Sequence, residues 1–155
     1  MKRVMGSLAR GVVLLAAIAA GGNGWAQSPG YPSSHVATRL PRGIVWHDNL
    51  DSGWRESQRT GRPMVIFITA ARCHYCDAMK QATWRNLGIE RRVNNEFVAV
   101  QLSPEHNPQE LSRITVEVFP MTIVAVPQGK VIGHRKGFQP PERLHELLNR
   151  AAFQR

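Results

Sequence analysis

The two cysteines of this chain, Cys73 and Cys76, stand two residues apart and shortly after a strongly apolar run, Pro63–Ile68. Six apolar residues in a row predict a strand that is buried on both faces. If a helix begins at the cysteines, its free backbone N–H groups and its dipole favour a thiolate at Cys73. A thiolate is the species that attacks disulfides. Cys76 follows about one helical turn later and can close on Cys73, so the pattern predicts a reversible dithiol.

Two other interpretations of the cysteine pair have less support. A structural disulfide between Cys73 and Cys76 would close a very small loop and remove little entropy from the unfolded chain. Structural zinc generally needs four nitrogen or sulfur ligands, usually in paired knuckles, and the chain has one such pair. His74 and a distant histidine could complete a zinc site, but nothing in the spacing requires it. We therefore predict redox chemistry and no metal.

The first 26 residues have the pattern of a secretory signal peptide. The basic residues Lys2, Arg3 and Arg10 precede an apolar stretch at 11–20, and Gly24-Trp25-Ala26 offers a small-x-small cleavage site before Gln27. The apolar stretch is shorter than the roughly 20 residues of a transmembrane helix, so a membrane anchor is the less favoured interpretation. We expect a periplasmic or secreted protein of 129 residues after cleavage near Ala26, without stable insertion into the membrane.

The charge of the chain does not indicate a nucleic-acid partner. The predicted signal peptide has three basic and no acidic residues, so its removal lowers the net charge from +9 to +6. The remaining Lys and Arg residues are scattered, without the clusters and interleaved aromatic residues that typify nucleic-acid binding. We interpret them as solvated surface, and the length suits one domain with one core.

The mature sequence divides into a linker at 27–42, rich in Pro, Ser and Gly, and a folded domain at 43–155. Within the domain, strands are predicted at 44–46, 63–70, 97–102, 121–126 and 131–134, and helices at 51–60, from the cysteines to about 83, and at 89–94, 109–114 and 140–152. A βαβ unit followed by a hairpin and a last helix predicts an α/β fold with a central mixed sheet and helices on both faces.

With these elements in place, the chain resembles the thioredoxin-like superfamily, and in particular its small secreted domains. The Cys-His-Tyr-Cys motif at 73–76 opens a helix after a buried strand, as it does in that superfamily. Val118-Phe119-Pro120 precedes the third core strand, where the superfamily has a cis-proline. Trp46 and Gly61-Arg62-Pro63 lie where the small secreted members have Trp and Gly-Lys-Pro. The resemblance runs from about Ile44 to Phe153 and implies the thioredoxin-like fold.

The resemblance also implies a role for each matching residue. Cys73 corresponds to the exposed attacking cysteine, Cys76 to the buried resolving cysteine and Pro120 to the cis-proline that faces the disulfide. The backbone of Phe119 would then pair with an extended substrate segment, and we assign Tyr75 to the same substrate-binding surface. The expected partners are protein or peptide disulfides and a thiol that donates or accepts electrons. No cofactor is implied beyond the dithiol itself.

Four positions depart from the Trp-Cys-Gly-Pro-Cys motif and its surroundings in thioredoxin: Arg72, His74, Tyr75 and Phe67. Arg72 precedes the first cysteine and His74 follows it, and both can place positive charge near the Cys73 sulfur and tune its chemistry. Phe67 stands where thioredoxin has a buried Asp, so the group that helps Cys76 lose its proton is absent or is supplied by another residue.

We therefore predict an exported thiol–disulfide oxidoreductase that acts through Cys73 and Cys76 in a reductase-like manner. The alternative is a non-enzymatic binding module that uses the thioredoxin-like groove, with a structural or metal-bound cysteine pair.

Overall fold

The structure is a computed structural model that describes residues 43–152. The predicted signal peptide at 1–26 and the predicted linker at 27–42 lie outside the described residues, as do residues 153–155. Those two segments and the domain boundaries therefore stay predictions.

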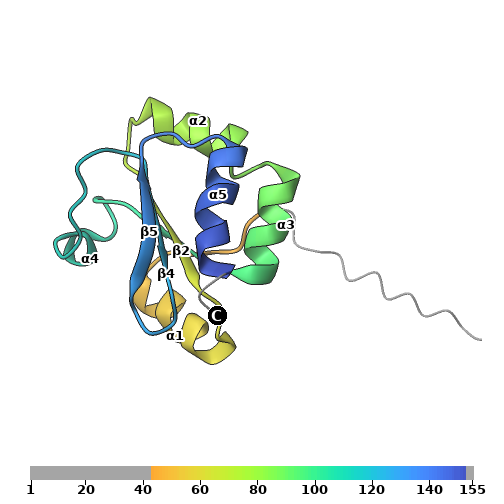
Figure 1. The fold of residues 1–155 in the computed structure, drawn as a ribbon. Helices are drawn as coiled ribbons and strands as arrows, with labels where there is room; N and C mark the ends of the chain where they lie inside the picture. The colour runs from red at the N-terminus through yellow and green to blue at the C-terminus, as the bar shows by residue number, and fades with distance from the viewer. Residues whose placement is uncertain (1–42, 153–155) are drawn as a thin grey trace, which may run out of the picture. The chain divides into compact units, whose positions relative to one another are not determined.

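The described part contains five strands and five helices in mixed order (Figure 1). They are β1 (Trp46–His47), α1 (Leu50–Thr60), β2 (Met64–Ile68), α2 (His74–Ala82), α3 (Leu87–Glu96), β3 (Val98–Leu102), α4 (Pro108–Leu111), β4 (Met121–Ala125), β5 (Val131–Lys136) and α5 (Pro141–Ala152).

The strands form one mixed sheet in the order β1-β3-β2-β4-β5. β1 and β2 both run parallel to β3, whereas β4 runs antiparallel to β2 and β5 runs antiparallel to β4. The predicted βαβ unit and hairpin are therefore both present, and the predicted α/β fold with a mixed sheet is confirmed. In the β2–β4 ladder, Phe67 lies opposite Thr122, a pairing that becomes important at the site.

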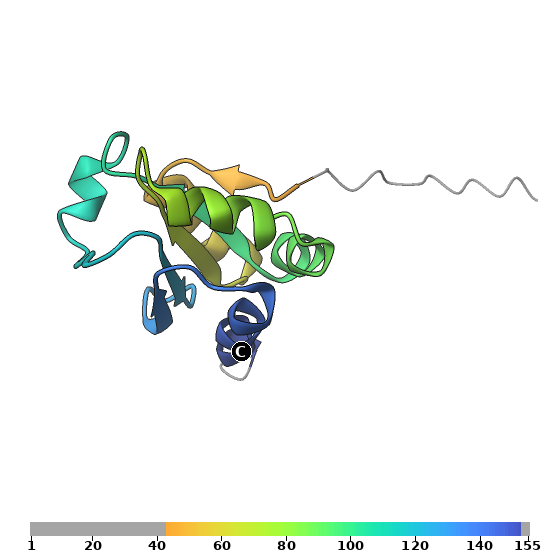
Figure 2. The same ribbon diagram turned by 90° about the horizontal axis from the view of Figure 1, so that it is seen from above.

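Helices cover both faces of the sheet (Figure 2). On one face, Val65 and Phe67 of β2 pack with core residues of α2, α3 and α5. On the other face, Met64, Ile66 and Ile68 pack with residues of β3 and β4 and with apolar side chains of α1 and α4. All five residues of β2 are buried, as a strand with helices on both sides requires.

Some element boundaries differ from the prediction for local reasons. α3 begins at Leu87 rather than at Ile89, because the side chain of Asn86 accepts hydrogen bonds from the Gly88 and Ile89 amides and caps the helix two residues earlier. α4 begins at Pro108, where the missing N–H of proline is tolerated, and it ends at Leu111 rather than at residue 114. β5 continues beyond the predicted residue 134 to Lys136.

Gly53 of α1 lies too close to the sheet for any other residue. A Cβ at this position would stand 2.3 Å from Cγ2 of Val100, a side chain without exposed surface. Overpacking a core costs about 1–3 kcal/mol, and alanine gains about 1 kcal/mol over glycine in a helix. We expect Gly53→Ala to lower the free energy of unfolding in urea, and Val100→Ala in the same chain to restore part of the loss. Unchanged stability of Gly53→Ala would contradict the close packing of α1.

Candidate functional site

Cys73 occupies the N-cap position of α2, at the helix terminus that stabilises negative charge. Its sulfur accepts a hydrogen bond from the backbone N–H of Cys76 at 3.2 Å, and its carbonyl accepts one from the Asp77 N–H at 3.1 Å. The side chain is partly exposed. A thiolate formed here would face a free backbone donor and the positive end of the helix dipole. The predicted position of Cys73 at a helix start is thus confirmed.

Cys76 lies one turn into α2 and is completely buried. Its sulfur is bonded to that of Cys73 in a disulfide with 5.2 Å between the two Cα atoms. Of the two cysteines, only Cys73 is therefore partly exposed to solvent. This difference is what a division into attacking and resolving cysteine needs.

The residues around the disulfide are exposed and charged. Arg72 adopts a left-handed backbone conformation with a φ of 53°, a conformation that non-glycine residues seldom adopt. The Tyr75 side chain is 65% exposed, and its ring packs edge-on against His74 with 5.7 Å between the centroids. The carboxylate of Asp77, in the first turn of α2, forms an ion pair with Lys80 at 3.4 Å. The tuning by Arg72 and His74 and the substrate contact of Tyr75 stay predictions.

Glu105, which the sequence analysis did not single out, holds the loop before the cysteines. Its carboxylate accepts a hydrogen bond from the Ala71 backbone N–H at 2.9 Å, two residues before Cys73. This hydrogen bond is the main reason why the pKa of Glu105 lies below its usual value. β2 and β3 are parallel, so the loops after them meet at one edge of the sheet. That topology is the signal from which Glu105 could have been found.

We expect Glu105→Ala to loosen the loop that carries Cys73. Without the carboxylate, the Ala71 amide should exchange with solvent several-fold faster, as measured by NMR. Because the pKa of Glu105 is lowered in the folded protein, the tether is intact at neutral pH and is lost as pH falls through that lowered pKa. Glu105→Gln keeps an oxygen acceptor and should exchange at an intermediate rate. Exchange at the wild-type rate in Glu105→Ala would show that the conformation of the loop does not depend on the Glu105 carboxylate.

Beneath the disulfide, the face of the sheet under α2 is aromatic rather than acidic. Phe67 has no exposed surface, and its ring lies 5.3 Å from that of Trp84 and 6.0 Å from that of Trp46. Among residues 43–152, the buried polar side chains include no Asp or Glu. Two threonines, Thr69 and Thr122, are buried on this side of the sheet instead. Sequence reasoning missed them, although a hydroxyl within or beside a buried strand is an unusual choice.

The peptide bond between Phe119 and Pro120 is cis, as the resemblance implies. Pro120 is buried, Phe119 is partly buried and packs against the core on the α1 side, and Val118 is 42% exposed. The pairing of the Phe119 backbone with a substrate and the facing of Pro120 to the disulfide stay predictions.

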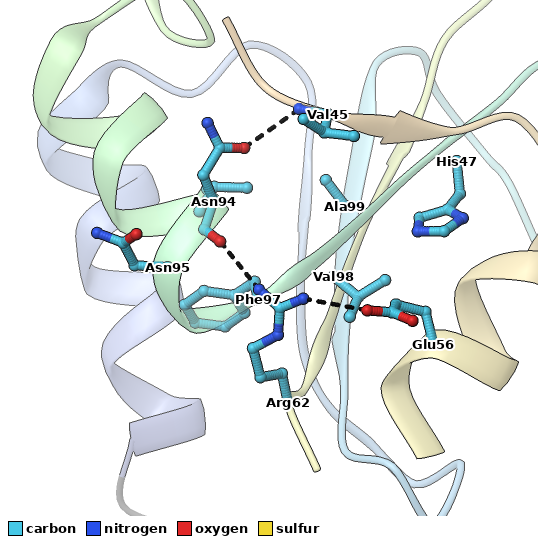
Figure 3. A pocket seen from close by; sticks show the side chains of 10 residues that line it. Val45, His47, Glu56, Arg62, Asn94, Asn95, Phe97, Val98 and Ala99 are labelled. Atoms are coloured by element: carbon cyan, nitrogen blue, oxygen red, sulfur yellow. Dashed lines mark hydrogen bonds and ion pairs between the residues drawn. The ribbon is translucent and has the colours of Figure 1, made fainter. Parts of the chain in front are cut away.

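A separate cleft of about 300 Å³ lies between α1, β1 and the end of α3 (Figure 3). Its polar groups bind one another: Arg62 donates to the backbone carbonyl of Asn94 at 2.9 Å and lies 3.5 Å from the Glu56 carboxylate. The Asn94 side chain in turn accepts from the Val45 N–H at 3.1 Å and donates to the Gly43 carbonyl at 2.9 Å. We interpret these hydrogen bonds as structural, because they attach the segment that leads into the short edge strand β1 to the end of α3.

Within residues 43–152, no group of three or more His, Cys, Asp and Glu side chains is arranged to hold a metal ion. In the same part of the chain, every helix is too short or too polar to cross a bilayer.

Comparison with known proteins identifies the family to which most of the domain belongs. The model of the thioredoxin-like domain family matches residues 50–152. Anterior gradient protein 3 of Mus musculus is 25% identical over 69 residues, which are 44% of this chain and 42% of that protein, so the match spans less than half of the relative's length. A thioredoxin from Thermus thermophilus superposes with a TM-score of 0.62 at 23% identity, over 69% of this chain and 86% of that one. The DsbH oxidoreductase superposes with a TM-score of 0.61 at 13% identity, over 71% and 85%. Both structures support the fold alone.

Proposed function

Because the chain belongs to the thioredoxin-like domain family, we propose that it is a thiol–disulfide oxidoreductase that reduces protein or peptide disulfides through Cys73 and Cys76. One observation carries the proposal. The two cysteines form a disulfide at the start of α2, with Cys73 partly exposed at the helix terminus and Cys76 fully buried. A disulfide that served only as a staple would need neither this asymmetry nor this position.

The proposed cycle needs no group beyond the dithiol. The Cys73 thiolate attacks a substrate disulfide, which forms a mixed disulfide and releases one substrate sulfur as a thiolate that takes up a proton. Cys76 then loses its proton and attacks the Cys73 sulfur, so the Cys73–Cys76 bond forms and the second substrate sulfur leaves and is protonated. The substrate gains two electrons, and an external dithiol returns them to the enzyme. We propose no cofactor and no metal.

We propose the reducing direction by analogy with thioredoxin, whose size the domain shares. The chain between the redox motif and Pro120 consists of the rest of α2, then α3, β3 and α4 with their loops.

An insulin-reduction assay tests the proposed function. Wild-type protein with dithiothreitol should accelerate the precipitation of reduced insulin, and Cys73→Ser should act at the rate of dithiothreitol alone. Acceleration by both proteins, or by neither, would favour the alternative of a binding module whose cysteine pair is structural.

We also propose that the protein acts after export, in the periplasm or outside the cell. The support is the sequence pattern of residues 1–26, which predicts a mature N-terminus near Gln27. Mass spectrometry of the protein recovered from the exported fraction should give a mass that begins at or near Gln27. A protein that keeps Met1 and stays with the membrane would contradict the proposed location.

A further inference from the structure

Two buried hydroxyls close to the disulfide have no partner in its oxidised state. Thr69 is 4% exposed and Thr122 is fully buried, yet neither Oγ1 atom finds a hydrogen-bond partner among residues 43–152. The other buried hydroxyls behave differently: Thr83 donates to the Gln139 carbonyl at 2.6 Å, and Ser57 donates to the Arg62 carbonyl at 2.6 Å. A buried polar group without a partner is destabilising, so these two threonines need an explanation.

Both threonines lie on the face of the sheet that α2 covers. Thr122 lies opposite Phe67 in the antiparallel ladder, and opposite residues point to the same face. Thr69 follows Phe67 by two positions and continues the ladder through its N–H bond to Leu102, so it shares that face as well. Phe67 belongs to the core cluster that includes Met79 of α2.

We infer from its place on α2 that Cys76 lies over the same face and at the same end of the sheet. It precedes Met79 by three positions, so the two side chains lie on one side of α2, and both are completely buried. The chain passes from the end of β2 through Thr69 to the first turn of α2, and Figure 1 shows α2 lying across this end of the sheet. Thr122 is the second residue of β4, which begins at this end because β4 runs antiparallel to β2.

We propose that Thr69 and Thr122 are positioning residues that donate hydrogen bonds to the sulfur of Cys76 once the disulfide opens. This proposal rests on the proposed function, since it concerns the step in which Cys76 resolves the mixed disulfide. A disulfide sulfur is a weak acceptor, whereas a thiolate is a strong one. The hydroxyls are therefore without a partner in the oxidised protein and gain one on reduction.

The hydroxyls would stabilise the thiolate without exchanging protons themselves. In the mixed disulfide, Cys76 passes its proton to solvent, and hydrogen bonds to the charged form lower the pKa of the thiol. The thiolate then attacks the Cys73 sulfur, and the substrate sulfur leaves and takes up a proton. Both threonines stay protonated throughout. In this way two neutral hydroxyl donors would take over the role of the buried Asp that thioredoxin has at the position of Phe67.

The charged groups near Cys76 are all at or near the surface. Arg135 of β5 lies opposite Thr122 and shares its face, and it is only partly buried. The others lie on α2 and the adjoining loops: Arg72, His74, Asp77 and Glu105 are exposed, and Lys80 is partly exposed. Against the fully buried sulfur of Cys76, these groups act through solvent, whereas the threonines can act by direct contact.

Threonine-to-valine variants test the proposal because they remove the donor and keep the shape. Equilibration with glutathione at alkaline pH, where Cys76 as well as Cys73 is a thiolate in the reduced protein, should show a more stable disulfide in Thr69→Val/Thr122→Val by about tenfold, which corresponds to a potential about 30 mV more negative. In a Cys73→Ala background, where Cys76 is the only thiol, thiolate absorbance should titrate about one pH unit higher with the two valines. Thr122→Ser keeps the donor and should retain most of the wild-type behaviour.

Thr83→Val is the matched control, because this buried hydroxyl already has a backbone partner. It should lower the stability of the oxidised and reduced proteins equally and leave the potential unchanged. Equal destabilisation of both redox states by the Thr69 and Thr122 variants, or an unchanged potential and titration, would overturn the proposal. The potential and titration need no protein substrate. A wild-type protein that fails to reduce insulin but shows these shifts would therefore refute the proposed function and leave this inference standing.

Discussion

Cys76→Ser should accumulate mixed disulfides with its substrates, whereas Cys73→Ser should trap none. Cys73 is partly exposed at the N-cap of α2 and Cys76 has no exposed surface, so only Cys73 can make the first attack. Without Cys76, nothing resolves the intermediate from within the protein, and turnover should fall to the background rate. Non-reducing electrophoresis of the variant mixed with a disulfide-containing protein should show a higher band that dithiothreitol removes.

The double variant Cys73→Ser/Cys76→Ser is the control for non-covalent binding, and it should give no such band. Alkylation of the reduced wild-type protein provides an independent measure, in which Cys73 should react much faster than Cys76. Equal trapping by the two single variants, or faster alkylation of Cys76, would reverse the roles that we assign to the cysteines.

The sequence was sufficient for the fold because its strongest patterns are local. Pro63–Ile68 predicts a buried strand since no polar residue interrupts it, and the structure buries all of Met64–Ile68. Gly61 predicts the end of α1, and it ends the helix in a left-handed conformation with a φ of 69°. The helical pattern alone predicts that α3 begins at Ile89, whereas the cap that Asn86 forms with two backbone amides starts the helix at Leu87.

Local sequence patterns do not predict contacts between residues that lie far apart in the chain. Glu105 and Ala71 are 34 positions apart, and only the parallel pairing of β2 and β3 brings their loops together. Thr122 becomes significant only when the register places it opposite Phe67. The two cysteines, by contrast, lie within one turn of helix, so their spacing alone indicated that they could meet. Sequence reasoning thus located the sulfur atoms but not the residues that surround them.

The redox potential of this dithiol should lie above that of thioredoxin, which is about −270 mV. Free cysteine has a pKa near 8.5, and C-x-x-C cysteines at helix N-termini fall to roughly 3.5–7.5. Cys73 has the amide of Cys76 aimed at its sulfur, and it has Arg72 and His74 as neighbours in the chain. Two carboxylates oppose this effect: Asp77 is paired with Lys80, whereas Glu105 keeps its negative charge while it accepts from the Ala71 amide. Stabilising the thiolate stabilises the reduced form, which makes the disulfide the stronger oxidant.

His74→Gln isolates the part of this effect that comes from the imidazole. An imidazole beside the Cys73 sulfur can place positive charge there, so its removal should make the potential more negative. His74→Lys places a permanent positive charge at this position and should not make the potential more negative, while His134→Gln, on β5 and exposed, is the control for loss of a histidine elsewhere. Equilibration with glutathione at several pH values, followed by alkylation, measures all four proteins. A wild-type potential at or below that of thioredoxin, unchanged in His74→Gln, would remove His74 from the mechanism and would favour a dedicated reductase.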